Sequence, residues 1–127
     1  MPNKTTQALA IGITIWLFGM LAIIAFGNAD WFPAIPIPIA FLTTLLMVAL
    51  TRWHLRDVPR AERSITAIRF GVAVTAVQFP LDALAWSAIF YLGFPPLTQA
   101  AREMLMIALE IGYFAMLVVP WWVGRRQ

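Results

Sequence analysis

The order of apolar and polar positions divides the chain into four apolar runs, which cover approximately residues 6–26, 34–53, 69–93 and 100–123. About 20 helical residues cross the roughly 30 Å hydrocarbon core of a bilayer, so each run is long enough for one membrane-spanning helix. The runs leave only short polar segments between them. The pattern therefore predicts one membrane domain, residues 1–127, folded as an all-α antiparallel bundle of four transmembrane helices.

The first run, Ala8 to Phe26, is longer than the roughly 7–15 apolar residues of a cleaved signal peptide, and only Lys4 precedes it as a basic residue. We therefore expect it to be a retained span. The second run begins among three prolines, Pro33, Pro36 and Pro38. Proline suits a first helical turn, where its missing N–H would have had no partner. Two alternatives remain: a proline-initiated helix, or an extended outer segment shielded inside the protein.

The composition agrees with a membrane protein: 61% of the residues are hydrophobic and 12% are charged. Soluble domains carry about twice that charged fraction. The net charge of +3 could indicate a nucleic-acid ligand, but the position of the basic residues argues against one. All except Arg102 lie at one set of helix ends, which is the positive-inside pattern and predicts cytoplasmic termini and a cytoplasmic middle loop. The bilayer is thus the first expected partner, with headgroup and topology contacts from Arg52, Arg56, Arg60, Arg63, Arg125 and Arg126.

Few residues are suited to catalysis or to binding a metal ion. The chain has no cysteine and a single histidine, His54, and it lacks the hydrolase, protease and nucleotide-binding motifs. We therefore expect no enzyme activity, no cofactor and no metal site. We expect His54 to be solvated at the membrane interface. In the same loop, Asp57 followed by Pro59 resembles a helix N-cap, so the third helix is expected to begin before Arg69.

The third run carries polar residues that a lipid-facing helix would not need. At 100° per residue, Thr75, Gln78 and Asp82 lie on one face of this helix, and we call them the polar stripe. Trp86 lies at its edge, and Pro80 interrupts the helix nearby. An ionisable side chain near the bilayer centre costs roughly 3 kcal/mol on insertion scales, so something in the protein must face Asp82.

A second acid, Glu110, lies at a similar depth in the fourth run, with Tyr113 toward the edge of the same face. Glu110 points away from the small residues of its helix, so it is expected to face the first or second helix or another copy of the chain. Two interpretations of the acids remain open. They form a functional polar site, or Asp82 bonds to Gln78, to a tryptophan or to a carbonyl freed by Pro80 and only fixes the packing.

The segments FGMLAIIAFG, FPLDALAWSAIFYLGFPPL and MLVVPWWVGRR make the chain similar to small four-span bacterial membrane proteins of uncharacterised function. The shared features are an aromatic-rich first span, a proline-aspartate element in the third span and a proline-containing outer turn. The resemblance implies a bacterial inner-membrane four-helix bundle and transfers no activity.

Two functions are compatible with these observations. The first is proton- or cation-linked transport or permeation through a polar site at the membrane midplane, formed by Asp82, Gln78, Thr75 and Glu110 and lined by Trp86, Pro80 and Tyr113. The second is an accessory or structural subunit whose polar residues specify helix contacts. In either case we expect a homo-oligomer or a larger membrane complex.

Overall fold

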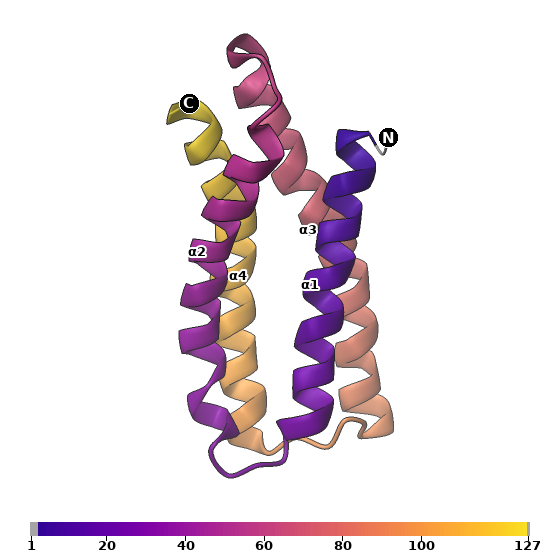
Figure 1. The fold of residues 1–127 in the computed structure, drawn as a ribbon. Coiled ribbons are helices and arrows are strands. Elements are labelled where there is room, and N and C mark those ends of the chain that lie inside the picture. Colours follow the sequence, from indigo (N-terminus) through magenta and orange to yellow (C-terminus); the bar gives the residue numbers. More distant parts are fainter. Residues whose placement is uncertain (1–2, 127) are drawn as a thin grey trace.

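The computed structural model describes residues 3–126, and their long elements are all helices (Figure 1). Four helices dominate: α1 (Lys4–Phe26), α2 (Pro36–Leu55), α3 (Arg63–Ser87) and α4 (Gln99–Arg126). Each is long and apolar enough to cross a membrane, and no strand occurs among the described residues. The prediction of an all-helical protein with four candidate spans is therefore confirmed.

Two of the four long helices, α1 and α4, begin after a side chain that accepts a hydrogen bond from a free backbone N–H group. Asn3 precedes α1, and its Oδ1 accepts a hydrogen bond from the backbone N–H of Thr6 at 2.7 Å. Thr98 precedes α4 in the same way, with its Oγ1 at 3.1 Å from the backbone nitrogen of Ala101. These side-chain caps fix the starts of α1 and α4.

The second helix starts at Pro36, directly after the short 3-10 helix η1 (Phe32–Ala34). Both are helical turns that contain a proline at their start, where no backbone donor is needed. The proline-initiated interpretation is therefore confirmed, and the extended alternative is wrong.

The third helix begins later than a cap at Asp57 would place it. A short 3-10 helix, η2 (Arg60–Glu62), leads into α3. Asp57 lies before both helices, and its Oδ2 forms an exposed ion pair with Nε of Arg56 at 3.5 Å. The start before Arg69 is confirmed, but the predicted cap is wrong. At its other end α3 continues into the π-helical turn η3 (Ala88–Leu92) and stops at Gly93, whose φ of 67° is the left-handed conformation that glycine adopts without strain.

The four helices run side by side in alternating directions, with both termini at one end (Figure 1). We call this the terminal end. The opposite end holds the two connections, residues 27–35 and 93–98, and we call it the hairpin end. The main helix contacts join α2 to α4, α3 to α4 and α1 to α3. Helix α1 therefore packs mainly on α3, although α2 follows it in the chain.

Glycines set the closest helix contacts. A methyl group on Gly71 of α3 would lie 2.6 Å from the carbonyl oxygen of Met116 in α4, and one on Gly124 would overlap the side chain of Ala67. On the other side of α3, a methyl group on Gly12 of α1 would lie 3.3 Å from Cβ of Val77. Absent side chains thus allow α3 to approach both neighbours, as small residues do in membrane helix pairs.

The interior contains three apolar clusters, one near each end and one between them. The central cluster consists of Ala8, Met47, Phe70, Val74 and Met116. Met47 and Val74 are fully buried in it. Large apolar side chains also cover the outer faces of all four helices, as expected for a surface in contact with lipid.

Candidate functional site

Asp82 of α3 joins three helices through its carboxyl group. Trp16 of α1 donates its indole N–H to Oδ1 at 3.1 Å. Tyr113 of α4 donates its hydroxyl to Oδ2. The side chain is half-buried, so the two donors replace part of the solvation that a bilayer cannot supply.

The two partners differ in what they can do when Asp82 changes its charge. An indole N–H is only a donor, whereas a phenol can donate or accept. Trp16 therefore bonds to Asp82 in either protonation state. Tyr113 can donate to the carboxylate and can rotate its O–H to accept a hydrogen bond from the protonated acid. The site thus satisfies both forms of the acid without moving a helix.

Gln78 lies one turn of α3 from Asp82, toward the terminal end, and it is 4% exposed. Its Nε2 donates to the backbone carbonyl of Gly12 in α1 at 2.6 Å. This contact is possible because Gly12 lets the α1 backbone approach α3. Gln78 therefore fixes α1 next to Asp82, and it does not contact the carboxyl group itself through any hydrogen bond between described atoms.

A cavity of about 230 Å³, which we call the inter-helix cleft, lies beside Asp82. Its lining combines side chains of all four long helices, with Gln78 and Asp82 from α3 and Tyr113 among those from α4. Most of the 20 lining residues are apolar, and no lysine, arginine or histidine is among those described. Asp82 is the single carboxyl group of this lining.

The other residues predicted for the site lie elsewhere. Thr75 bonds to the carbonyl of Gly71 in its own helix at 2.8 Å, Pro80 is exposed, and Trp86 stacks on Phe90 at 5.5 Å. None of these three lines the inter-helix cleft as described. The structure therefore brings together Asp82, Gln78 and Tyr113, with Trp86 and Pro80 on other surfaces of the same helix.

Glu110 also lies apart from Asp82. It is exposed on the outward face of α4, among apolar side chains that are exposed as well: Met106, Ile107, Phe114 and Leu117. Of the alternatives for Glu110, a position facing α1 or α2 is wrong. An outward position remains, where another protein chain or lipid would meet it.

Trp16 is the residue that the sequence did not identify. Tryptophan side chains of membrane proteins are enriched at the two interfaces, where the ring nitrogen reaches water. Trp16 lies in the middle of its apolar run instead. That position could have identified Trp16 as a partner of a polar group, because an indole N–H within the hydrocarbon core needs a hydrogen-bond acceptor.

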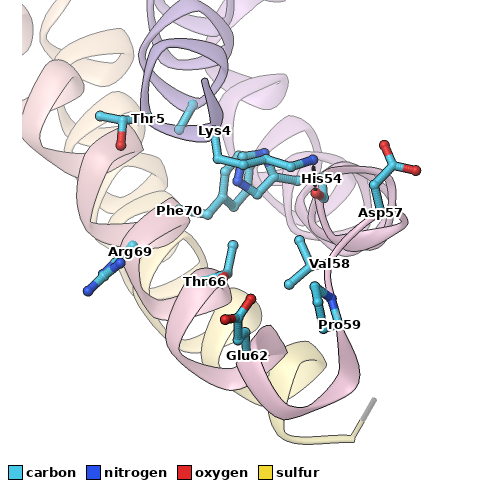
Figure 2. A pocket seen from close by; sticks show the side chains of 11 residues that line it. Lys4, Thr5, His54, Asp57, Val58, Pro59, Glu62, Thr66, Arg69 and Phe70 are labelled. Carbon is cyan, nitrogen blue, oxygen red and sulfur yellow. Dashed lines mark hydrogen bonds between the residues drawn. The ribbon is translucent and has the colours of Figure 1, made fainter. Parts of the chain in front are cut away.

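A second pocket, of about 370 Å³, opens at the terminal end between the start of α1, the end of α2 and the start of α3 (Figure 2). We call it the terminal pocket. Its charged lining residues are Lys4, Arg69, Asp57 and Glu62, so both signs are present in equal number. This balance favours no ligand charge, which makes the inter-helix cleft the better candidate site.

His54 lies in the wall of the terminal pocket, and the prediction that it is solvated is wrong (Figure 2). It is 1% exposed, its ring stacks on Phe70 with 4.5 Å between ring centres, and its Nδ1 lies 2.8 Å from Oε1 of Gln7. Lys4 also donates to its backbone carbonyl at 2.6 Å. The contacts of Gln7 and Lys4 join α1 to α2 at the terminal end, and the stacking on Phe70 joins α2 to α3.

The basic residues predicted to contact headgroups surround the terminal end. Arg56 lies over Trp53, Arg125 over Trp121 and Arg126 over Trp122, with 5.0–5.4 Å from the guanidinium carbon to the ring centre. These pairs combine a cation with an aromatic ring at one depth, as interfacial anchors do.

No group of three or more histidine or acidic side chains among residues 3–126 is arranged to hold a metal ion.

Comparison of the chain with known protein families, with curated proteins and with solved structures finds no match.

Proposed function

We propose that this protein is a multi-pass membrane protein of the bacterial inner membrane, a four-helix bundle with its terminal end in the cytoplasm. The distribution of basic residues supports this orientation, because a cytoplasmic excess of lysine and arginine sets topology. The terminal end carries Lys4, Arg52, Arg56, Arg60, Arg63, Arg69, Arg125 and Arg126. Arg102 belongs to the first turn of α4, at the hairpin end.

We further propose proton- or cation-linked transport or permeation, with Asp82 as the group that exchanges the ion. The supporting observation is the pair of donors on Asp82, which accommodates the carboxylate and the protonated acid in one side-chain arrangement. Asp82 also lines the inter-helix cleft, so a ligand in the cleft can reach it. Gln78 positions α1 at the site. Intramembrane acids of this kind commonly belong to ion and substrate pathways.

Access to Asp82 from the terminal end passes through the central cluster. Ala8 and Phe70 of this cluster line the terminal pocket, and Met116 lines the inter-helix cleft. Met47 and Val74, both fully buried, pack between them. In the proposed mechanism, the described conformation is closed toward the cytoplasm, and transport requires α1 and α2 to separate at this cluster.

Asp82→Asn tests the transport proposal. Asparagine keeps an oxygen that can accept from Trp16 and an amide that can donate to Tyr113, but it cannot take up a proton. Purified protein is reconstituted into liposomes that contain a pH-sensitive dye, and proton flux is measured under an imposed ion gradient. We expect flux from the unchanged protein and from Asp30→Asn, an exposed acid of the hairpin end, and none from Asp82→Asn. Normal flux through Asp82→Asn would refute the proposal.

The alternative function is that of an accessory subunit in a larger membrane complex. The outward position of Glu110 favours an interface between this chain and another protein chain. A carboxyl group facing lipid costs roughly 3 kcal/mol on insertion scales, so a second protein surface is expected to cover it. We propose that a second copy of this chain does so, covering the outward face of α4 around Glu110 across a two-fold axis. Co-purification of a different membrane protein in fixed ratio would instead support the accessory role.

A further inference from the structure

The lining of the inter-helix cleft restricts the chemistry of a ligand. It offers one carboxyl group, that of Asp82, no basic side chain among the described residues, and a largely apolar surface to which Trp16, Tyr113 and Phe32 contribute aromatic rings. An anion would find no positive partner there. A neutral polar molecule would lose its hydration without regaining hydrogen bonds along most of the wall.

A bare metal cation fits the cleft poorly as well. Hard cations such as Ca²⁺ take about 6–8 oxygen ligands. The side chains of the lining carry fewer, five oxygens in all: two on Asp82 and one each on Thr43, Gln78 and Tyr113. A ligand of this cleft therefore needs a positive charge but cannot depend on several oxygen donors.

We propose that the inter-helix cleft binds a small quaternary ammonium ion with an apolar body. This proposal rests on the proposed function, because it takes Asp82 as the ion-exchanging group. A quaternary nitrogen has no N–H to satisfy, so it approaches the carboxylate without displacing Trp16 or Tyr113. The faces of these aromatic rings attract such cations, which are commonly recognised by aromatic side chains. The apolar body of the ligand contacts the apolar side chains that α1, α2 and α4 contribute to the lining.

The volume of the cleft limits the size of the ligand. Pockets for drug-sized molecules usually measure roughly 300–1,000 Å³. At about 230 Å³ the inter-helix cleft is smaller, so it holds a cation with one ring or a few short alkyl groups. Benzyltrimethylammonium combines a quaternary nitrogen with one aromatic ring and is a suitable probe. Its binding to the carboxylate excludes the proton from Asp82, which couples the two ions.

The test is equilibrium dialysis of radiolabelled benzyltrimethylammonium against the protein in nanodiscs, with empty nanodiscs as the blank and benzylsulfonate as an anion of similar shape. We expect saturable binding of the cation, none of the sulfonate, and a loss of affinity of about tenfold or more in Asp82→Asn. Affinity should also fall at acidic pH, because protons compete for Asp82. Equal affinity in Asp82→Asn, or binding of the sulfonate, would overturn the proposal.

A second variant tests the position of the ligand without changing a charge. Gly112 lines the cleft, and a methyl group added there would meet no atom within 4 Å. Gly112→Leu should therefore fold and fill part of the cleft, lowering the affinity for benzyltrimethylammonium more than that for the smaller tetramethylammonium. Ala49→Leu, on the exposed face of α2, is the matched control and should change neither affinity. Equal affinities in Gly112→Leu and the control would place the ligand outside the cleft and refute the assignment.

Lipid is the competing occupant of the cleft. If native mass spectrometry finds a lipid retained by the unchanged protein and by Asp82→Asn, and benzyltrimethylammonium does not displace it, the cation proposal is wrong. The outcomes also separate this proposal from the transport function. Flux that depends on Asp82 without cation binding removes only the ligand assignment, whereas cation binding without any flux removes only the transport function.

Discussion

The hydrogen bond between Trp16 and Asp82 should contribute measurably to the attachment of α1. Helix α1 is the most loosely held of the four, since only Ala8 and Gly12 among its described residues are buried. Trp16→Phe removes the indole N–H that lies 3.1 Å from Oδ1 of Asp82 and keeps an aromatic ring in place. Asp82→Leu removes the acceptor and replaces the carboxyl group with an apolar side chain of similar length.

The size of this contribution follows from the type of bond. Side-chain hydrogen bonds between membrane helices average about 0.6 kcal/mol and reach about 1.7 kcal/mol in double-mutant cycles. Bonds to a group that can carry charge are stronger than bonds between neutral groups. We therefore expect a coupling free energy of about 1–2 kcal/mol between Trp16 and Asp82.

The assay is reversible unfolding in mixed micelles of dodecyl sulfate and dodecylmaltoside, followed by far-ultraviolet circular dichroism because Trp16→Phe alters tryptophan fluorescence. Free energies of unfolding are measured for the unchanged protein, each single variant and the double variant. Loss of the indole volume contributes to both arms of the cycle and cancels. Additivity within about 0.3–0.5 kcal/mol would show that the two residues do not interact and would refute the described site.

Three further predictions concern the helix contacts. Gly124→Val should destabilise the protein by about 1–3 kcal/mol, because the valine side chain would overlap Ala67. The control is Gly19→Ala, which should change the free energy of unfolding little because a methyl group there meets no atom within 4 Å. Equal effects of the two variants would contradict the described α3–α4 contact. Met47→Ala should lower the free energy of unfolding by about 2–5 kcal/mol, and it should raise passive proton leak in liposomes because it opens the central cluster. Unchanged leak would argue against this cluster as the barrier between the terminal pocket and the inter-helix cleft. Single cysteines are informative because the chain has none of its own. Phe114→Cys, on the face of Glu110, should form disulfide-linked dimers on oxidation and Leu45→Cys, on the exposed face of α2, should not; the reverse result would place the dimer interface on α2.

The elements of the fold were predictable because lipid imposes a simple rule on the sequence. A helix that crosses a bilayer needs about 20 apolar residues, and this requirement alone located α1 to α4. A proline-initiated helix was one of the two alternatives for the second run, and α2 begins at Pro36. Local chemistry was informative there because a first turn involves only neighbours in the chain.

Contacts between helices were less predictable, since lipid-facing and protein-facing residues of membrane helices are equally apolar. Gly12 and Gly19 both belong to the first apolar run, but only Gly12 meets α3 closely. The periodicity of α3 likewise grouped Thr75 with Asp82, whereas the Thr75 hydroxyl bonds within its own helix. Periodicity gives the face of a residue and does not give the helix opposite to it.

Charge was a better guide than periodicity at Asp82 and a poor one at His54. An acid in a span requires partners, so the prediction that protein groups face Asp82 followed from energy alone, although Trp16 could not be identified. His54 was expected to be solvated because it stands in a charged loop segment. Its burial depends on Gln7 and Phe70, which are distant in the sequence and become neighbours only through helix packing.

The most direct test of the account is to observe the protonation of Asp82 in the membrane. Infrared difference spectra between acidic and alkaline pH are recorded for the protein in nanodiscs, with carbon-13-labelled aspartate to distinguish aspartic acid bands from those of glutamic acid and lipid. We predict a protonated carboxyl band that is present at acidic pH, disappears as the pH is raised, is absent from Asp82→Asn and is kept in Glu110→Gln. A spectrum of Asp82→Asn identical to that of the unchanged protein would contradict the central role of Asp82.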